Sequence, residues 1–569
     1  MGATPGRWAP PLVVALTTLV SFAPALDNQF VVEWDDGATL VSNPAFRGLD
    51  GSHLAWMFTA THMGHWMPLT WISLGSDYLV WGMNPHGYHL TSVLLHVASS
   101  LVFYFVALRL LRVATPSRGE TGLRMGAGAA ALFFAIHPLR VESVAWVTER
   151  RDVLSGLWFL LTILTYLKAV QPGASRRWLG VSVGCYVLAL ASKASTMTLP
   201  PLLVILDFYP LRRIGSRWRQ WLVPEARRIW MEKIPYLALA LGAAVVAGYA
   251  QRGFAEPLAI RPAAGRIAVA LYGLWFYVYK TAAPYPIWPL YEIPARVDPL
   301  ALPMVASGAA VALLTGALFF LRRRWPAGLA VWIAYAIMLA PMSGLTQSGP
   351  QLVAARYTYL SCLGFALLFG AGVARVVDGA ASRASRPGFA RAGPAMLGLA
   401  LLALAALSWA QIRVWRDSQS FWSHAVSADP PSAIAYNNLG ARLIEQGRLD
   451  EAEVLIRKAL QLRPEYEDAH SNLAVILERR GQPDQAREAR MKLGYALLRR
   501  GKLREAGAVF QREVDARPED AVAHNNLGVA LFLEGDLLPA ARQFQRALEI
   551  KPDFAEAKRN LAAALAQLR

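Results

Sequence analysis

Residues 88–108 read YHLTSVLLHVASSLVFYFVAL. A helix needs about 20 mostly apolar residues to cross a bilayer, and this stretch, which lacks Asp, Glu, Lys and Arg, is long enough. Apolar stretches recur on both sides of it between Pro10 and Ile412. The sequence therefore predicts a polytopic bundle of membrane helices in residues 1–412.

Twelve runs in this part are candidate spans. They are 10–26, 88–108, 125–139, 153–167, 178–192, 194–206, 234–251, 267–279, 299–321, 325–341, 357–374 and 392–412. The run Ile267–Tyr279 is short, and the stretch TAAPYPIWPLYEIP that follows it favours a helix lying at the interface with aromatic anchors. We therefore expect about 11 spans.

The distribution of charge sets the domains and the orientation. Of all residues, 55% are hydrophobic and 17% charged, and the charged, helix-forming sequence begins after Arg413. The net charge of +18 lies in short clusters between apolar runs, which is typical of cytoplasmic loops rather than of a surface that binds nucleic acid. One such loop holds Arg109, Arg112, Arg118 and Arg124, whereas 27–87, the first outer loop, has Arg47 as its one basic residue. An odd number of spans then places the C-terminal region outside.

The C-terminal region repeats itself. Small residues recur at Gly440, Ala474, Gly494, Gly528 and Ala562, in steps of 34, 20, 34 and 34. Together with Pro464, Pro518 and Pro552, this period is typical of tetratricopeptide (TPR) repeats. We expect a linking helix in 413–432 and an array in 433–569 of about 3–4 repeats. The second repeat has lost 14 residues from its second helix, and Ala555–Arg569 forms a cap.

TPR arrays present a concave face that binds a peptide or a partner protein. Asn438, Asn472 and Asn526, with neighbouring asparagines, fall where such arrays offer amides to an extended backbone. A purely structural role for these asparagines is the alternative.

Acidic and basic residues follow several spans on the predicted outer side. EWDDGATLVSNPAF (33–46) places Asp35 and Asp36 just after the first span, where they are either a solvated loop start or a general base. Adjacent like charges raise the pKa of one of them. HPLRVESVAWVTERRD (137–152), Lys193 and Arg356 add further charges close to the bilayer. Cations here suit a phosphate-bearing lipid, with snorkelling or structural ion pairs as the alternative.

Six histidines lie in or near the first outer loop, at His53, His62, His65, His86, His89 and His96. They lack the spacing of a zinc site, so we predict no metal ligands, although a divalent cation stays open. The nucleotide-binding motifs GxxxxGK[ST] and GxGxxG are absent from the sequence.

Four strings together resemble a known family. WDDGATLVSNP, HPLRVESVAWVTERRD, ASKASTMTLPPLLVILDFY and RYTYLSCLGFALL, followed by the repeats, are similar to the transmembrane and TPR-containing O-mannosyltransferases and their bacterial relatives. The resemblance implies a membrane glycosyltransferase of the GT-C fold. It would move a sugar from a polyprenyl-phosphate carrier to an acceptor protein on the outer side, with inversion, and the TPRs would bind the acceptor.

The resemblance also implies roles for single residues. Asp35 and Asp36, with Glu142, match the catalytic positions, whereas Arg150, Lys193 and Arg356 match positions that would hold the donor phosphate. Ala194 departs from the family pattern, which has an acid there. The Ala- and Arg-rich composition suggests a bacterial inner membrane with the array in the periplasm, and the sugar, mannose or another, stays open. A non-catalytic membrane-anchored TPR scaffold and a ligase or polymerase of lipid-linked polysaccharide are the competing hypotheses.

Overall fold

The computed structural model describes residues 8–215, 218–253, 262–294, 296–345, 349–382 and 387–568. The chain divides into two compact units, Met1–Phe421 and Trp422–Arg569.

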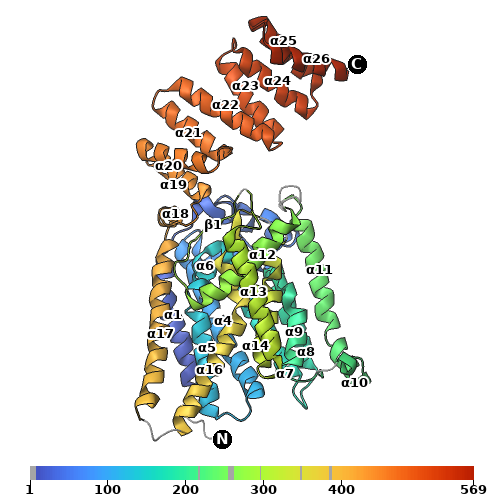
Figure 1. The fold of residues 1–569 in the computed structure, drawn as a ribbon, viewed down its shortest axis with the longest axis vertical. Coiled ribbons are helices and arrows are strands. Elements are labelled where there is room, and N and C mark those ends of the chain that lie inside the picture. Colours follow the sequence, from blue (N-terminus) through green and yellow to red (C-terminus); the bar gives the residue numbers. More distant parts are fainter. Residues whose placement is uncertain are drawn as a thin grey trace. The chain divides into compact units, whose positions relative to one another are not determined.

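The first unit is a bundle of helices, many of which run alongside one another in Figure 1. Among the residues that the structure describes, six helices are long and apolar enough to cross a membrane, or up to eight if each of two bent pairs is one span. The chain is therefore a multi-pass membrane protein. The main helices are α1 (Ala9–Phe22), α4 (Pro85–Ala114), α5 (Glu120–Ala135), α7 (Arg150–Ala169), α8 (Arg177–Ser192), α9 (Leu199–Phe208), α11 (Ile234–Ala250), α12 (Ala263–Ala282), α13 (Leu302–Phe320), α14 (Pro326–Leu339), α16 (Leu363–Ser382) and α17 (Pro387–Val414).

Three predicted spans are shorter than expected. The stretches Arg177–Ser192, Ala194–Phe208 and Pro326–Met342 are apolar but have only 10–17 residues in helix. The run Ile267–Tyr279 lies inside α12, which has 20 residues yet is not apolar enough to be a candidate span.

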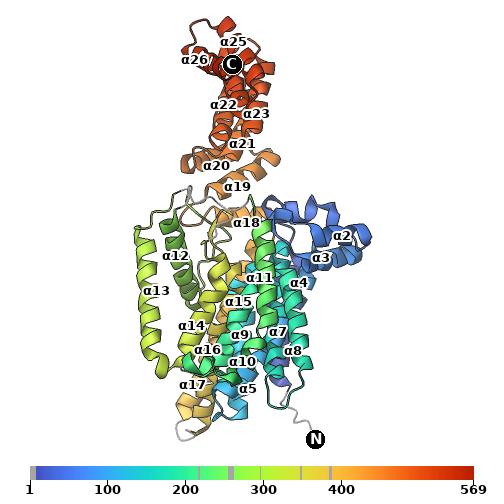
Figure 2. The ribbon, with the colours of Figure 1, turned by 90° about the vertical axis from the view of Figure 1, so that its right-hand side faces the viewer.

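The first outer loop is folded rather than extended. It contains the π-helical turn η3 (Val32–Val41) and the helices α2 (Gly51–Thr59) and α3 (Pro68–Trp81). Their apolar side chains share a core around the fully buried Phe46, Met57 and Trp71. Figure 2 shows α2 and α3 at the end of the bundle opposite to α10 (Pro224–Met231).

The last helix of the bundle, α17, ends at the same side as this loop. The backbone N–H of Gln29 donates to the carbonyl of Arg416 at 2.7 Å, and that of Val32 donates to the hydroxyl of Ser418 at 3.1 Å. The membrane unit therefore ends beside the start of the first outer loop.

The unit is almost entirely helical, as the sequence predicts. Two short strands, β1 (Tyr291–Glu292) and β2 (Gln351–Val353), form an antiparallel pair with Tyr291 opposite Val353. The hydroxyl of Tyr277 on α12 accepts a hydrogen bond at 2.9 Å from the backbone of Ala354, just after β2. This small sheet positions Arg356, which follows within three residues.

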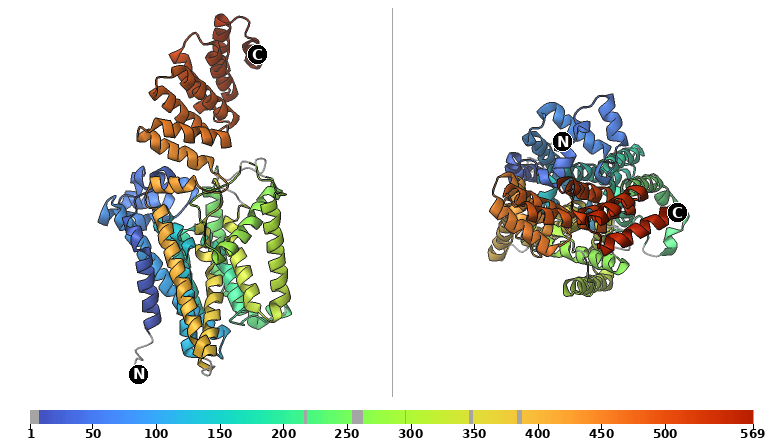
Figure 3. Two further views of the ribbon diagram at one scale, coloured as in Figure 1. Left: turned by 60° about the vertical axis from the view of Figure 1, so that its left-hand side comes forward. Right: turned by 90° about the horizontal axis from the view of Figure 1, so that it is seen from above.

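The second unit is a stack of helices (Figure 3). They are α19 (Ala433–Glu445), α20 (Leu449–Leu462), α21 (Glu467–Arg479), α22 (Pro483–Arg499), α23 (Leu503–Ala516), α24 (Ala521–Glu534), α25 (Leu537–Ile550) and α26 (Ala555–Leu568). The predicted linking helix appears as α18 (Ser418–Ala425) and the cap as α26.

The 20-residue step has a different cause from the one expected. The second repeat has no shortened second helix. Instead, the single 17-residue helix α22 carries both Ala486, which marks a second helix, and Gly494, which marks the next first helix. This fused helix packs against both α21 and α23.

The small residues of the period allow close helix contacts. A Cβ atom at Gly440 would lie 2.7 Å from Ile456, and one at Gly528 would lie 2.6 Å from Phe544. Helices of a pair can therefore approach only because these positions lack a side chain.

Candidate functional site

Asp36 anchors the first outer loop to the bundle. Its side chain is buried, and one carboxylate oxygen accepts hydrogen bonds from the backbone and the hydroxyl of Thr148, at 3.0 and 2.6 Å. The other oxygen accepts from the backbone of Val31 at 2.9 Å. Gly37 permits the tight turn of η3, since a Cβ there would lie 2.1 Å from the carbonyl oxygen of Val32. Both carboxylate oxygens of Asp36 therefore accept hydrogen bonds, and the side chain holds η3 in place.

Asp35 is the free member of the pair. It is half-buried, and its carboxylate makes no hydrogen bond or ion pair within the described part of the chain. Burial raises its pKa above 3.8, although the positive charges of Arg151 and Arg356 oppose this increase. A half-buried carboxylate with a raised pKa and no partner can accept a proton from a bound group.

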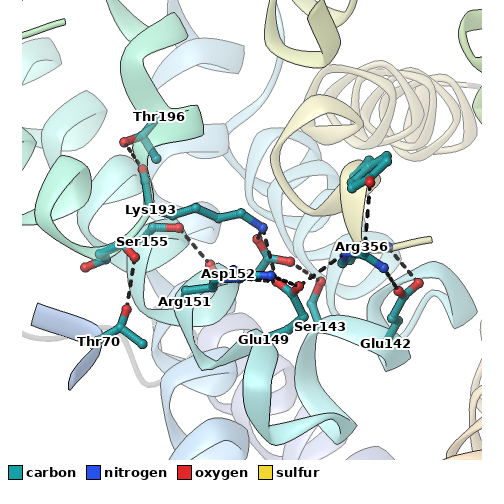
Figure 4. Close-up of polar contacts among 12 residues, drawn as sticks. Thr70, Glu142, Ser143, Glu149, Arg151, Asp152, Ser155, Lys193, Thr196 and Arg356 are labelled. Carbon is teal, nitrogen blue, oxygen red and sulfur yellow. Dashed lines mark hydrogen bonds and ion pairs between the residues drawn. The ribbon is translucent and has the colours of Figure 1, made fainter. Parts of the chain in front are cut away.

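Figure 4 shows a cluster of charged side chains. Three of its members, Arg151, Arg356 and Glu149, act electrostatically on Asp35. At the centre of the cluster is the fully buried Glu149, which accepts hydrogen bonds from the guanidinium of Arg151 at 2.7 and 3.2 Å. The ammonium of Lys193 lies 3.1 Å from Glu149, and Nε of Arg356 lies 3.2 Å from it. Glu149 therefore brings three cations from three separate segments to one place.

Two further carboxylates complete this cluster. Asp152 pairs with Lys193 at 2.5 Å and accepts a hydrogen bond from Ser143 at 3.0 Å. Glu142 forms an ion pair with the guanidinium of Arg356 and accepts from its backbone N–H at 3.1 Å. Each cation of the cluster therefore has a carboxylate partner.

Arg150 is not part of this cluster. Its guanidinium is fully buried, pairs with Asp77 at 2.7 Å and donates to Ser73, Ser92 and the carbonyl of Tyr88. All of these partners lie on α3 and α4. The geometry therefore does not fit the expectation that Arg150 holds a donor phosphate; it ties the outer loop to the bundle.

Four residues of this region, Glu149, Arg151, Asp152 and His65, were given no individual role from the sequence. Arg151, Glu149 and Asp152 belong to the string ERRD, which signalled charge but not which side chains would meet. His65 is half-buried, and its pKa is lowered well below 6.5 by burial and by the positive charges of Arg151 and Lys193. His65 is therefore neutral near pH 7.

The asparagines of the repeat array bind one another. Asn472 donates to Asn437 at 2.9 Å, and Asn437 donates to Asn438 at 3.0 Å. Asn526 donates to the hydroxyl of Tyr495 at 2.8 Å. These amides link successive repeats, which supports the structural alternative for Asn438, Asn472 and Asn526.

Metal ligands are not gathered anywhere in the described ranges, where no group of three or more His, Cys, Asp or Glu residues could hold an ion.

The buried Asp36 predicts a pH dependence of stability. Burial raises its pKa from 3.8 to about 6, so between these values the folded chain holds a proton that the unfolded chain has released. This stabilisation is complete below pH 3.8 and is lost as the pH rises through 6. Its size is about 3 kcal/mol. The unfolding midpoint of the purified protein should therefore fall between about pH 4 and about pH 7. Asp36→Asn, which cannot ionise, should show a smaller fall, and equal falls in both proteins would contradict the prediction.

Comparison with known sequences gives two kinds of match. Residues 443–490 and 491–553 match the tetratricopeptide repeat family. Protein O-mannosyl-transferase Tmtc1 of Drosophila melanogaster is 26% identical over 503 residues, which cover 72% of this chain and 56% of that protein. Human protein O-mannosyl-transferase TMTC4 is 30% identical over 221 residues, covering 36% of this chain and 29% of that protein.

The chain resembles the transmembrane and TPR-containing O-mannosyltransferases. This confirms the resemblance predicted from the sequence strings. The chain spans about half the length of the O-mannosyltransferase relatives that match most of it.

Among solved structures, ArnT from Cupriavidus metallidurans bound to undecaprenyl phosphate covers 85% of this chain and 80% of its own, at 16% identity and a TM-score of 0.33. A superposition this loose does not locate a ligand site in the present chain.

Proposed function

We propose that this protein is a membrane glycosyltransferase that moves a sugar, such as mannose, from a polyprenyl-phosphate carrier to hydroxyl groups of an acceptor protein on the outer side of the membrane. The observation that carries the proposal is Asp35, which has no hydrogen-bond or ion-pair partner among the described residues and on which the charges of Arg151 and Arg356 act. The similarity to O-mannosyltransferases supports the reaction class.

The chemistry assigns one step to each kind of group. The oxygen of the acceptor hydroxyl attacks the anomeric carbon of the sugar, and Asp35 takes the proton of that hydroxyl. The bond from this carbon to the phosphate oxygen breaks, which gives inversion and leaves the carrier phosphate with one additional negative charge. Arg356 and Lys193 stabilise that charge, aided by Arg151 in the place first expected for Arg150.

The orientation follows from the number of spans. The eight candidate spans and the three shorter apolar helices together number eleven, provided that α12 does not cross. With Arg109, Arg112, Arg118 and Arg124 inside, the first outer loop, Asp35 and the start of the array lie outside. In a bacterial inner membrane this side is the periplasm.

The test is a transfer assay with the purified full chain in lipid nanodiscs. Mannosyl-phosphoryl-polyprenol carrying a radiolabelled sugar is offered together with a serine- and threonine-containing peptide. We expect label on the peptide and release of polyprenyl phosphate. Label transferred instead from a nucleotide sugar, or no transfer from any polyprenyl-phosphate-linked sugar, would reject the proposal in favour of another donor class or of a non-catalytic scaffold.

A further inference from the structure

The fused helix α22 leaves a groove in the repeat unit. Side chains of α20, α21 and α22 line a cavity of about 710 Å³. Its lining includes Leu473 and Leu477 of α21, Gln485 and Ala489 of α22, and Gln461 of α20. Both glutamines are exposed, and their carboxamides make no hydrogen bond among the residues that the structure covers.

His470 contributes a buried polar atom that has no partner. Its ring is 6% exposed and lines the groove. Nε2 lies 2.8 Å from the carbonyl oxygen of Pro464, which can only accept, so Nε2 carries the proton. Burial lowers the pKa of His470 below 6.5, so Nδ1 bears a lone pair at neutral pH. Within the described ranges nothing donates to that lone pair.

The helix pair α24 and α25 shows which hydrogen-bond donor His470 lacks. α24 and α25 begin at Ala521 and Leu537, and α21 and α22 begin at Glu467 and Pro483, so the two pairs have the same spacing. His524 then matches His470, and its Nε2 likewise lies 3.0 Å from the carbonyl of Pro518. However, Nδ1 of His524 is 2.7 Å from the carboxamide of Gln543, whose nitrogen donates when the amide is turned toward the ring.

The position that matches Gln543 is Ala489. In the second repeat, an alanine therefore replaces the side chain that fills this space and satisfies the histidine. A buried acceptor without a donor is destabilising, and a ligand that supplies the donor removes this cost.

We propose that this groove holds an extended, uncharged peptide segment that contains serine or threonine. A hydroxyl of the peptide donates to Nδ1 of His470, while Gln461 and Gln485 pair with its backbone. An apolar side chain of the peptide rests on Leu473 and Leu477. The inference rests on the proposed function, because such a segment is an acceptor for sugar transfer to a hydroxyl.

The charges at the rim agree with an uncharged occupant. Lys492 pairs with Glu488 at 2.7 Å, Arg499 pairs with Glu465, and Arg457 pairs with Glu453 at 2.6 Å. Because these opposite charges are already matched, the groove offers no excess charge to a strongly acidic or basic peptide.

The deciding variant is Ala489→Gln, which copies the arrangement at Gln543. The full chain in nanodiscs is titrated with a fluorescein-labelled peptide of threonine, glycine and valine repeats and with a counterpart that has alanine for threonine. We expect Ala489→Gln to weaken binding of the threonine peptide at least tenfold. The alanine counterpart should bind the wild-type chain just as weakly.

Two further variants exclude indirect effects. Ala508→Gln, at an exposed position of α23 outside the groove, should bind like the wild type. Gln485→Ala changes an exposed side chain without touching the core, and should weaken binding at least threefold. Ala489→Gln or Gln485→Ala with wild-type affinity would overturn the inference.

The binding experiment also separates this inference from the transferase proposal. Asp35→Asn should bind the threonine peptide like the wild type. If the wild type transfers no sugar but Ala489→Gln still loses the peptide, the transferase proposal fails and the groove assignment stands. If the wild type transfers sugar and Ala489→Gln binds unchanged, the groove assignment alone fails.

Discussion

Replacing Asp35 by asparagine is expected to reduce sugar transfer about 10²–10⁴-fold, which is the usual contribution of a positioned general base. Asparagine has the same shape but cannot accept the hydroxyl proton. Because the Asp35 carboxylate has no hydrogen-bond partner among the described residues, the substitution should leave the unfolding midpoint unchanged. The measurement is the initial rate of label transfer per folded molecule in the nanodisc assay.

Asp36→Asn is the matched control for this experiment. The asparagine oxygen can still accept from Thr148, but its amide nitrogen would face the N–H of Val31, so two donors would meet. We expect a lower unfolding midpoint with a transfer rate per folded molecule that stays within about tenfold of wild type. The reverse pattern, with Asp36→Asn inactive and Asp35→Asn active, would exchange the two roles and reject the assignment.

Glu149→Gln is expected to have the largest effect on stability. The substitution removes the negative charge that Arg151, Lys193 and Arg356 share. It leaves three cations, whose side chains are 10–15% exposed, with the two carboxylates Glu142 and Asp152. An uncompensated buried charge costs about 3–5 kcal/mol. In a chain of this size we expect the midpoint, followed by tryptophan fluorescence in detergent, to fall by roughly 3–5 °C.

The matched substitution is Glu120→Gln, at the other end of the bundle. Glu120 pairs with Arg112 at 2.5 Å and with Arg124 at 2.6 Å, but its side chain is 46% exposed. Exposed pairs contribute about 0–1 kcal/mol, so this variant should unfold within about 1 °C of wild type. Similar shifts of the unfolding midpoint in the two variants would mean that the stability of the cluster around Glu149 does not depend on charge balance.

Much of the fold was predictable because it depends on periodicities. The long apolar run of α4 indicates a membrane helix, and the 34-residue spacing of Gly494 and Gly528 indicates TPR repeats. The fused helix α22 was not predictable in the same way. A 20-residue step is compatible both with a shortened helix and with two helices that have merged, and only packing against α21 and α23 distinguishes these.

The site was predictable as a set of segments but not side chain by side chain. Adjacent residues on a helix point about 100° apart, so Arg150 faces α3 and α4 while Arg151 faces Glu149. Similarly, the sequence presents Asp35 and Asp36 as equivalent. The turn of η3 buries one against Thr148 and leaves the other accessible.

The equal numbers of acids and cations around Glu149 determine how a lipid substrate would arrive. A neutral patch exerts little pull on anions dissolved in the surrounding water, and salt screens what remains. On the proposed function, a carrier would therefore be gathered by its hydrocarbon tail dissolving in the bilayer and diffusing sideways. The abundance of the carrier in the lipid phase, rather than ionic strength, would determine how often the carrier encounters the protein.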